Sequence, residues 1–239
     1  MKNSAIILAG GSGRRMGSST PKQFLTLDHK PILWYSLNTF SSSDIIDEIV
    51  IVSSKEYIDH IQSEIVDLYG FHKVTAITEG GRERYHSVAR GLSSVSYDTD
   101  HVFIHDGARP FVSSYTIERC LHYVIKHDAA VAAVRSKDTI KIADDDRFIS
   151  STPNREQVWQ VQTPQVFSYK LITDAYEKLL DQEDRLAQAG IMVTDDTMVV
   201  KMFEDKDAKL VESSYDNIKI TTPDDMLYAK AILESRNKE

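Results

Sequence analysis

Continuous apolar runs alternate with helix-like patterns through the first half of this 239-residue sequence. The runs predict buried strands at residues 5–8, 45–53, 74–78, 101–105 and 130–134. Between them, apolar residues at helical spacing predict helices at residues 32–40, 57–68, 84–93 and 114–126. Strands that alternate with helices indicate an α/β fold, in which a Rossmann-like, mostly parallel sheet carries helices on both faces.

The pattern changes after residue 134. Residues 138–142 alternate polar and apolar side chains, three aspartates at residues 144–146 mark a turn, and residues 147–149 resume the pattern. This predicts a β-hairpin that leaves the main body as a protruding arm at about residues 136–156. An arm with its own apolar side needs something to pack on, and a second subunit is one possibility.

The rest of the chain returns to the main body. Its pattern predicts an apolar segment at residues 158–161, helices at residues 169–180 and 195–203, and a strand near residues 218–221. A final helix is signalled by Thr222 as N-cap and Pro223 in the first helical position. Because no repeat, low-complexity tract or flexible linker interrupts the sequence, we expect one domain, residues 1–239, with the arm as its extension.

The first strand leads into a glycine-rich turn that begins at Gly10 and Gly11. Glycines allow a sharp bend, and successive amides turned inward form a concavity that binds anions. Residues 1–27 contain four basic residues and no acidic one, whereas the whole chain has a net charge of −8. This reversal of charge suits a polyphosphate; the alternative is an ordinary strand and turn with solvated arginines.

Two familiar phosphate-binding loops are excluded at this turn. The sequence has no glycine followed after four residues by Gly-Lys-Ser/Thr, as a P-loop requires. Met16 stands where the dinucleotide fingerprint has its third glycine, and the second strand ends without the ribose-binding acid. The turn therefore predicts a triphosphate site of another kind.

Composition restricts the classes of protein that fit. Hydrophobic residues make up 41% and charged residues 27%, as is usual for globular proteins. The acidic balance argues against a nucleic-acid partner, and no apolar run approaches the ~18 residues of a membrane span. The single cysteine, Cys120, excludes an internal disulfide and lies at helical spacing with apolar residues, so we expect a core thiol. We expect a cytoplasmic protein with no membrane or nucleic-acid partner.

Two polar clusters follow predicted strands, at the sheet edge where ligands of parallel sheets gather. The first, from Gly81 to Ser87, opens a helix whose free N–H groups suit a base or a phosphate. Its alternative is a helix entry with exposed charges. The second holds Asp106 and Arg109, which suit hydroxyls, a phosphate, or magnesium bound through water. Its alternative is a structural ion pair at the turn before Pro110.

Two further cations are candidates for a site. In the segment from Ile218 to Ile220, the isoleucines point to one face and Lys219 points to the other. Arg155 lies in a loop whose apolar neighbours are expected to pack, so that its side chain projects. A solvated surface residue is the alternative for both.

Taken together, these segments resemble the 2-C-methyl-D-erythritol 4-phosphate cytidylyltransferase family of the nonmevalonate isoprenoid pathway. The resemblance spans nearly the whole chain in the family's order and rests on several separate motifs: LAGGSGRRMG, PKQF, GGRERYHS, HDGARPF, VWQVQTPQVF, TDD and YDNIKITTPDD. It implies transfer of CMP from CTP to methylerythritol phosphate, with release of pyrophosphate and with Mg²⁺ held mainly by the CTP phosphates.

The resemblance also implies roles for individual residues. Arg15 and Lys22 would stabilise charge on the reacting α-phosphate, while Arg155 and Lys219 would position the acceptor phosphate. Asp106, Arg109 and Thr139 would lie near it. The arm would form a homodimer and carry its threonine and arginine toward the partner's site. The cytidine triphosphate would lie between two turns: Leu8, Ala9, Gly10 and Gly11 on one side, and Gly81, Arg82, Glu83, Arg84 and Ser87 on the other.

Some residues depart from the family pattern and keep alternatives open. The run from Leu8 to Gly11 replaces the common Pro-Ala-Ala-Gly, Arg82 stands where an acid is often found, and Pro153-Asn154-Arg155 departs from Asp-Arg-Asn. Because LAGG recurs in ribitol-5-phosphate cytidylyltransferases, CDP-ribitol synthesis is the alternative, although HDGARPF and the tryptophan of VWQVQTPQ favour methylerythritol phosphate. A sugar-1-phosphate nucleotidyltransferase and a non-catalytic nucleotide-binding module are the remaining alternatives.

Overall fold

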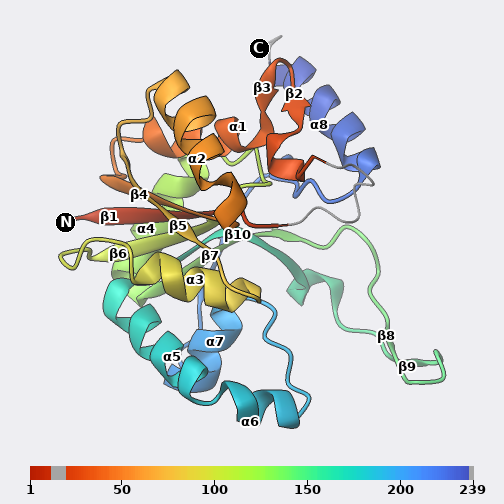
Figure 1. Cartoon of the computed structure of the whole chain (residues 1–239). Helices are drawn as coiled ribbons and strands as arrows, with labels where there is room; N and C mark the ends of the chain where they lie inside the picture. Colours follow the sequence, from red (N-terminus) through yellow and green to blue (C-terminus); the bar gives the residue numbers. More distant parts are fainter. Residues whose placement is uncertain (12–19, 237–239) are drawn as a thin grey trace.

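A seven-stranded sheet forms the centre of the computed structural model, which describes residues 1–11 and 20–236 (Figure 1). Its strands are arranged in the order β11-β7-β10-β6-β1-β4-β5. Only β10 among these seven runs antiparallel to its neighbours. The bounds are β1 Asn3–Leu8, β4 Glu48–Ser53, β5 Val74–Glu79, β6 His101–Asp106, β7 Ala129–Arg135, β10 Trp159–Ser168 and β11 Lys209–Glu212.

Helices cover both faces of the sheet (Figure 1). One face carries α1 (Ile32–Ser41), α2 (Ile58–Ile61) and α4 (Ser114–His127), and the other carries α3 (Arg84–Leu92), α5 (Tyr169–Asp181) and α7 (Asp196–Glu204). A short helix, α6 (Glu183–Gln188), follows α5. The last helix, α8 (Pro223–Arg236), packs with α1 and a small hairpin, β2 (Thr26–Leu27) and β3 (Lys30–Pro31).

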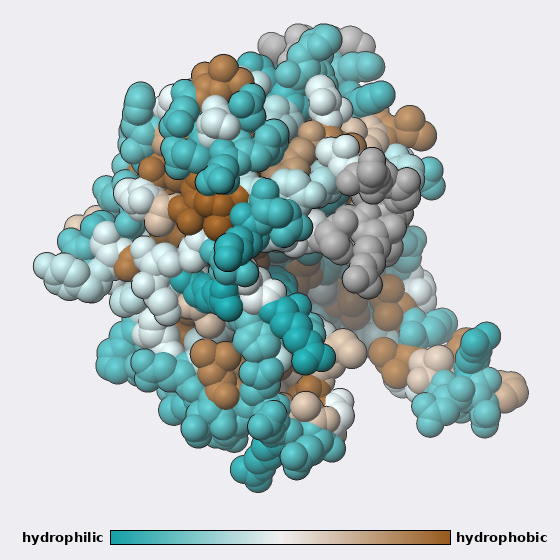
Figure 2. Space-filling view, viewed as in Figure 1, coloured by the Kyte–Doolittle hydropathy of each residue, from teal (hydrophilic) through white to brown (hydrophobic). Residues whose placement is uncertain are grey.

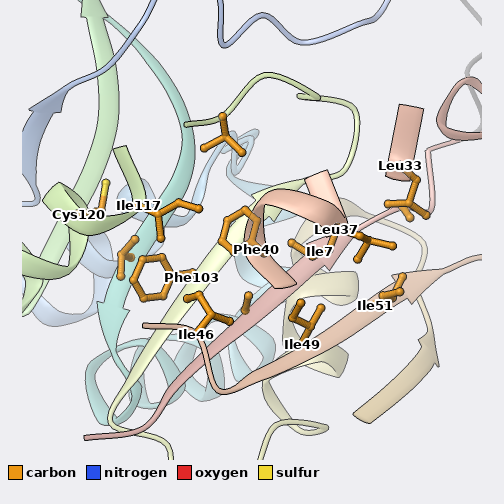
Figure 3. Close-up of a cluster of buried hydrophobic side chains, with 14 of the residues drawn as sticks. Ile7, Leu33, Leu37, Phe40, Ile46, Ile49, Ile51, Phe103, Ile117 and Cys120 are labelled. Carbon is orange, nitrogen blue, oxygen red and sulfur yellow. The ribbon is translucent and has the colours of Figure 1, made fainter. Parts of the chain in front are cut away.

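The alternation of side chains along β1 divides the core into two clusters. Ile7 packs on the side of α1, while Ile6 packs on the side of α3. Figure 3 shows the first cluster, in which Ile7 lies among Leu37, Phe40 and Phe103. Cys120 is fully buried in this cluster, which confirms the predicted core thiol, and burial raises the pKa of the thiol to about 12.

The structure confirms the predicted α/β class and the strands of the first half, with ends that move by up to three residues. The helix predicted at residues 57–68 is divided into a 3₁₀ turn, η3 (Lys55–Tyr57), then α2, then a π-helical segment, η4 (Gln62–Asp67). Buried residues Ile61 and Ile65 still face the core from this irregular segment.

The strand predicted near residues 218–221 is wrong, because the segment pairs with no strand in the part of the chain that the structure describes. A backbone hydrogen bond from the N–H of Ile220 to the carbonyl of Ala108, at 2.9 Å, joins the segment to the turn after β6. The predicted facing is nevertheless confirmed: Ile220 is buried and Ile218 packs beside it, while Lys219 points away to an ion pair. The sequence pattern also missed β11 and α6.

The predicted arm projects from the main body as a two-stranded hairpin (Figures 1 and 2). Its strands are shorter than expected, β8 (Ile142–Ala143) and β9 (Ile149–Ser151), and residues 138–141 are not in a strand. The aspartates form the predicted turn, since Asp144 Oδ1 accepts a hydrogen bond from the N–H of Phe148 at 2.8 Å. Phe148 is 72% exposed at the tip. Within residues 1–11 and 20–236, no helix combines the length and the apolarity that crossing a bilayer requires.

Glu48 is a buried carboxylate at the first residue of β4, at the opposite edge of the sheet from the glycine turn, and it joins three segments. Its oxygens accept hydrogen bonds from the hydroxyls of Ser4 and Thr75, both at 2.9 Å, and from the N–H and hydroxyl of Ser96 at 3.0 and 2.9 Å. Burial alone would raise the pKa of Glu48, but these hydrogen bonds outweigh it and lower the pKa below its ordinary value of 4.5.

We expect Glu48→Gln to lower the free energy of unfolding at pH 7 by about 1–3 kcal/mol, because buried donors lose a charged acceptor. Since the folded pKa of Glu48 lies below its unfolded value, its contribution is complete above about pH 4.5 and is lost as the pH falls through the folded pKa. Urea unfolding of both proteins between pH 3 and 7 measures this. A difference in the free energy of unfolding that stayed constant from pH 3 to pH 7 would contradict this role of the Glu48 carboxylate.

Candidate active site

A cleft of about 400 Å³ opens at the carboxyl ends of β1 and β6. Residues from segments that are far apart in the sequence line it, and most were predicted as site residues. The glycine turn and the segment after it supply Leu8, Gly10, Gly11 and Lys22; the second turn supplies Gly81, Arg82, Glu83, Arg84 and Ser87; the remaining residues are Asp106, Ala108 and Lys219.

Of the predicted residues that the structure describes, four do not line this cleft. Arg109 lines a second hollow of about 400 Å³, which shares Arg84, Asp106 and Lys219 with the first. Ala9 is buried behind the turn. Thr139 and Arg155 are exposed, the first at the base of the arm and the second in a 3₁₀ turn, η5 (Arg155–Gln157), and neither lines either hollow. Arg15 lies outside the described residues.

The backbone at Ala9 fixes the start of the glycine turn. Its N–H donates to the carbonyl of Val52 at 2.7 Å, and its carbonyl accepts from the side-chain amide of Gln23 at 2.6 Å. Gln23 is almost fully buried, so it ties the turn to the segment that follows Lys22. The sequence analysis did not single out Gln23; its place directly after Lys22 in the PKQF motif is the signal that could have found it.

Lys22 and Lys219 approach the cleft from two different segments. Lys22 Nζ donates to the carbonyl of Ile220 at 3.0 Å, and Lys219 Nζ lies 2.7 Å from Oδ2 of Asp106. The two lysines therefore belong to one site, although 196 residues of sequence separate them.

The second turn is shaped by hydrogen bonds within residues 81–87. The N–H of Gly81 donates to Oγ of Ser87 at 3.1 Å. Glu83 caps α3, and its own N–H donates to Nδ1 of His86 at 3.2 Å, which completes a capping box. Gly81 lies against His86 so closely that a β-carbon placed on it would be 2.2 Å from Cβ of His86. Only glycine fits this position without a change in the turn.

Arg84 is anchored rather than mobile. Its guanidinium forms two hydrogen bonds with the carboxylate of Asp196, at 2.7 and 2.8 Å, and Asp196 also accepts from the hydroxyl of Tyr176 at 2.6 Å. Burial alone would lower the pKa of Arg84, but the charge of fully buried Asp196 outweighs it and raises the pKa. Asp196 was not predicted as a site residue, although it belongs to the TDD motif of the resemblance.

Three cationic groups surround the carboxylate of Asp106. Besides Lys219, Nε of Arg84 lies 3.6 Å from Oδ1 and Nε of Arg109 lies 3.9 Å from Oδ2. Burial of Asp106 would raise its pKa, but the charges of Arg84, Lys219 and Arg109 outweigh burial and lower the pKa far below its usual range. Asp106 is therefore ionised at neutral pH.

A buried histidine supports this carboxylate from behind. His105 Nε2 lies 3.2 Å from the carbonyl of Arg109, and Nδ1 lies 3.0 Å from Oγ1 of Thr163. Oγ1 of Thr163 in turn accepts from the N–H of Asp106 at 3.1 Å. Burial lowers the pKa of His105 to about 4, so the ring is neutral at pH 7. It therefore fixes the strand end without adding a charge to the site.

The charges of the cleft favour polyanions. Lys22, Arg82, Arg84 and Lys219 line it together with two carboxylates, those of Glu83 and Asp106. This excess of positive charge attracts phosphate groups to the cleft, although the chain as a whole has a net charge of −8. The described residues contain no group of three or more His, Cys, Asp or Glu side chains arranged to hold a metal ion.

Comparison with known proteins agrees with this geometry. The family model described as "IspD: 2-C-methyl-D-erythritol 4-phosphate cytidylyltransferase" matches residues 4–235. A curated 2-C-methyl-D-erythritol 4-phosphate cytidylyltransferase of Lachnospira eligens is 47% identical over 97% of this chain and 99% of its own length. Another, from Clostridium botulinum, is 49% identical over 98% of each chain.

Solved structures show the same likeness. A 4-diphosphocytidyl-2C-methyl-D-erythritol synthase from Anaerococcus prevotii superposes with a TM-score of 0.85 at 37% identity, covering 98% of this chain and 96% of its own. A 2-C-methyl-D-erythritol 4-phosphate cytidylyltransferase from Francisella tularensis gives 0.77 at 29% identity, covering 97% and 99%.

We expect Gly81→Ala to destabilise the protein by about 1–3 kcal/mol, because the new methyl group collides with His86. Gly10→Ala is the matched control: its β-carbon would meet its nearest neighbours at 3.7 Å, an ordinary contact, so we expect less than about 1 kcal/mol. Thermal or urea unfolding of the ligand-free variants measures both. Equal stability of the two variants would contradict the packing described for the second turn.

Proposed function

Because the chain belongs to the 2-C-methyl-D-erythritol 4-phosphate cytidylyltransferase (IspD) family, we propose that the cleft between its two turns is the active site of that reaction. The enzyme transfers CMP from CTP to 2-C-methyl-D-erythritol 4-phosphate, a step of isoprenoid precursor synthesis. The observation that carries the assignment of the site is the meeting of Lys22 and Lys219 at one cleft, beside two backbone turns suited to anions.

The chemistry explains why such a site needs cations more than a strong base. An oxygen of the acceptor phosphate attacks the α-phosphorus of CTP, the bond from that phosphorus to the bridging oxygen breaks, and pyrophosphate leaves with the electron pair. The nucleophile is already an anion, so no proton has to be removed. The barrier lies in bringing two anions together and in the charge that develops in the transition state, which fixed cations stabilise.

We assign roles to the cations by their places around the cleft. Lys22, beside Gly10 and Gly11, stabilises charge on the α-phosphate; Arg15, outside the described residues, is proposed to act with it. Lys219 and Arg109 lie toward the second hollow, where the acceptor phosphate is proposed to bind. The nucleotide then lies between the glycine turn and residues 81–87, with Arg82 and Glu83 at its side.

Magnesium is part of this proposal. The cleft offers the carboxylates of Asp106 and Glu83, and oxygen is the ligand that Mg²⁺ prefers. Since Asp106 is ionised but already paired with three cations, we propose that the CTP phosphates hold most of the ion's coordination. When bound, the ion would neutralise charge on the triphosphate.

We further propose a homodimer in which the arm reaches the partner's site. Thr139 and Arg155 line neither hollow of their own chain, and the arm ends in exposed apolar side chains, Phe148 and Ile149. A second subunit would cover these apolar side chains, and Thr139 and Arg155 would lie in the active site of that subunit. Sedimentation equilibrium that found only monomers at micromolar concentration would exclude this arrangement.

Domain organisation and location complete the proposal. We propose one nucleotidyltransferase domain over residues 1–239, with the arm at about residues 136–156. A cytoplasmic location is supported by Cys120, a free thiol of the kind usual in reducing compartments.

We expect pyrophosphate release from CTP with 2-C-methyl-D-erythritol 4-phosphate to exceed release with ribitol 5-phosphate by at least about 100-fold in kcat/KM, because sites that bind substrate hydroxyls discriminate strongly. A coupled pyrophosphate assay with each acceptor measures this. Preference for ribitol 5-phosphate would transfer the assignment to the sister activity, and release with neither acceptor would refute catalysis.

We expect Lys22→Ala to lower kcat by about 100-fold or more while the Kd of CTP changes much less, because the lysine acts mainly on charge that develops in the transition state. Single-turnover kinetics and calorimetric titration with CTP separate the two effects. Equal losses in binding and turnover would argue for a ground-state role. Lys230→Ala, on α8 and away from the cleft lining, is the control for loss of a lysine.

A further inference from the structure

Three consecutive residues of the second turn are held by two helices that do not themselves reach the proposed nucleotide site. Arg84 is held by Asp196 at the start of α7, as described above. The next two residues, Tyr85 and His86, both contact one carboxylate on α6: Glu183. Tyr85 and His86 belong to the GGRERYHS motif, whereas Glu183 lies outside all the motifs that carry the family resemblance.

The contact with Glu183 is bidentate. The hydroxyl of Tyr85 donates to Oε1 at 3.1 Å, and Nε2 of His86 lies 2.9 Å from Oε2. The two rings lie against each other, with centroids 4.4 Å apart. The hydrogen bond with His86 is the largest influence on the carboxylate and lowers the pKa of Glu183 below its ordinary value. Glu183 is therefore ionised at neutral pH and suited to accept both bonds.

His86 connects this carboxylate to the backbone of the turn. Because Nδ1 accepts from the N–H of Glu83, Nε2 carries the proton and donates to Glu183. The other side of the same residue is the surface against which Gly81 packs. The bond from Glu83 to Nδ1 and the packing of Gly81 against Cβ and Cγ thus join His86 to residues 81–83, all of which line the cleft.

α6 is held near the turn by the side chain of Leu186. Leu186 packs against the second core cluster, as Tyr85 does, and the N–H of Leu186 donates to the carbonyl of Gln182 at the end of α5 at 3.0 Å. A cavity of about 500 Å³ separates the rest of α6 and residues 190–193 from the turn, so the Glu183 contact bridges an otherwise open space.

We propose that Glu183 is a positioning residue for CTP: through His86 and Tyr85 it holds the turn of residues 81–87 in the shape that receives the nucleotide. This inference rests on the proposed place of the nucleotide in the cleft. It predicts that loss of Glu183 weakens nucleotide binding in ground state and transition state alike, because the turn encloses the same nucleotide in both.

The test compares Glu183→Ala with Asp184→Asn, a matched control that removes a carboxylate from the next residue of α6, where the side chain is exposed. For Glu183→Ala we expect the KM and the Kd of CTP to rise about tenfold, kcat to change less than about threefold, and the KM of the acceptor to stay the same. For Asp184→Asn we expect wild-type values. Glu183→Gln keeps an acceptor for one of the two bonds, so its KM and Kd for CTP should lie between those of the wild type and those of Glu183→Ala.

A double-mutant cycle separates positioning from a general loss of stability. If Glu183 acts through His86, then Glu183→Ala should raise the KM of CTP by less than about twofold when His86 is already alanine. Full additivity of the two changes, or an unchanged KM in Glu183→Ala, would overturn the proposal. Should Glu183→Ala fail to fold, the same cycle with Glu183→Gln decides. If Glu183→Ala has the same kcat and the same KM for CTP as the wild-type enzyme, only this inference is refuted. The proposed nucleotide site itself is refuted if bound CTP protects none of residues 81–87 from hydrogen exchange.

Discussion

The carboxylate of Asp106 is buried at the end of a central strand, and three cationic side chains compensate for the water it has lost. Burial of an unpaired carboxylate would cost several kcal/mol, so this arrangement is stable only while the cations stay in place. Two of them are also fixed from elsewhere: Arg84 by Asp196, and Arg109 by the carbonyl of Asn217 at 2.7 Å. The cationic groups are thus in position before any phosphate arrives, which is the condition for efficient stabilisation of a transition state.

The sheet order explains why these groups meet. Since β1 lies between β4 and β6, with β5 beyond β4, the turns that follow β1, β5 and β6 emerge at the same edge (Figure 1). The antiparallel strand β10 brings Thr163 behind Asp106, and the segment after β11 brings Lys219 to its front. Figure 2 shows the arm extending well away from this body, and Thr139 and Arg155 line neither hollow of their own chain. A partner subunit is the natural destination for them in the proposed dimer.

Much of this could be predicted from the sequence because the deciding signals are local. Continuous apolar runs determine buried parallel strands, and the cleft contains most of the predicted site residues because those residues directly follow such strands. The failures concern contacts that form only in three dimensions. Lys219 faces the site without a strand, because one hydrogen bond to Ala108 replaces a strand partner. Asp196 and Glu183 act through partners about 100 residues away in the sequence, and no spacing of residues reveals such pairs.

In the proposed mechanism, fixed cations around Asp106 bring two phosphate-bearing substrates together in one cleft. The most direct measurement is a crystal structure with Mg²⁺, the acceptor and a CTP analogue whose α,β-bridging oxygen is replaced by a methylene group. We expect the triphosphate between residues 8–11 and 81–87, with the acceptor phosphate on Lys219 and the contact of Lys219 with Asp106 retained. A nucleotide bound outside this cleft, or Lys219 turned away from both substrates, would contradict it.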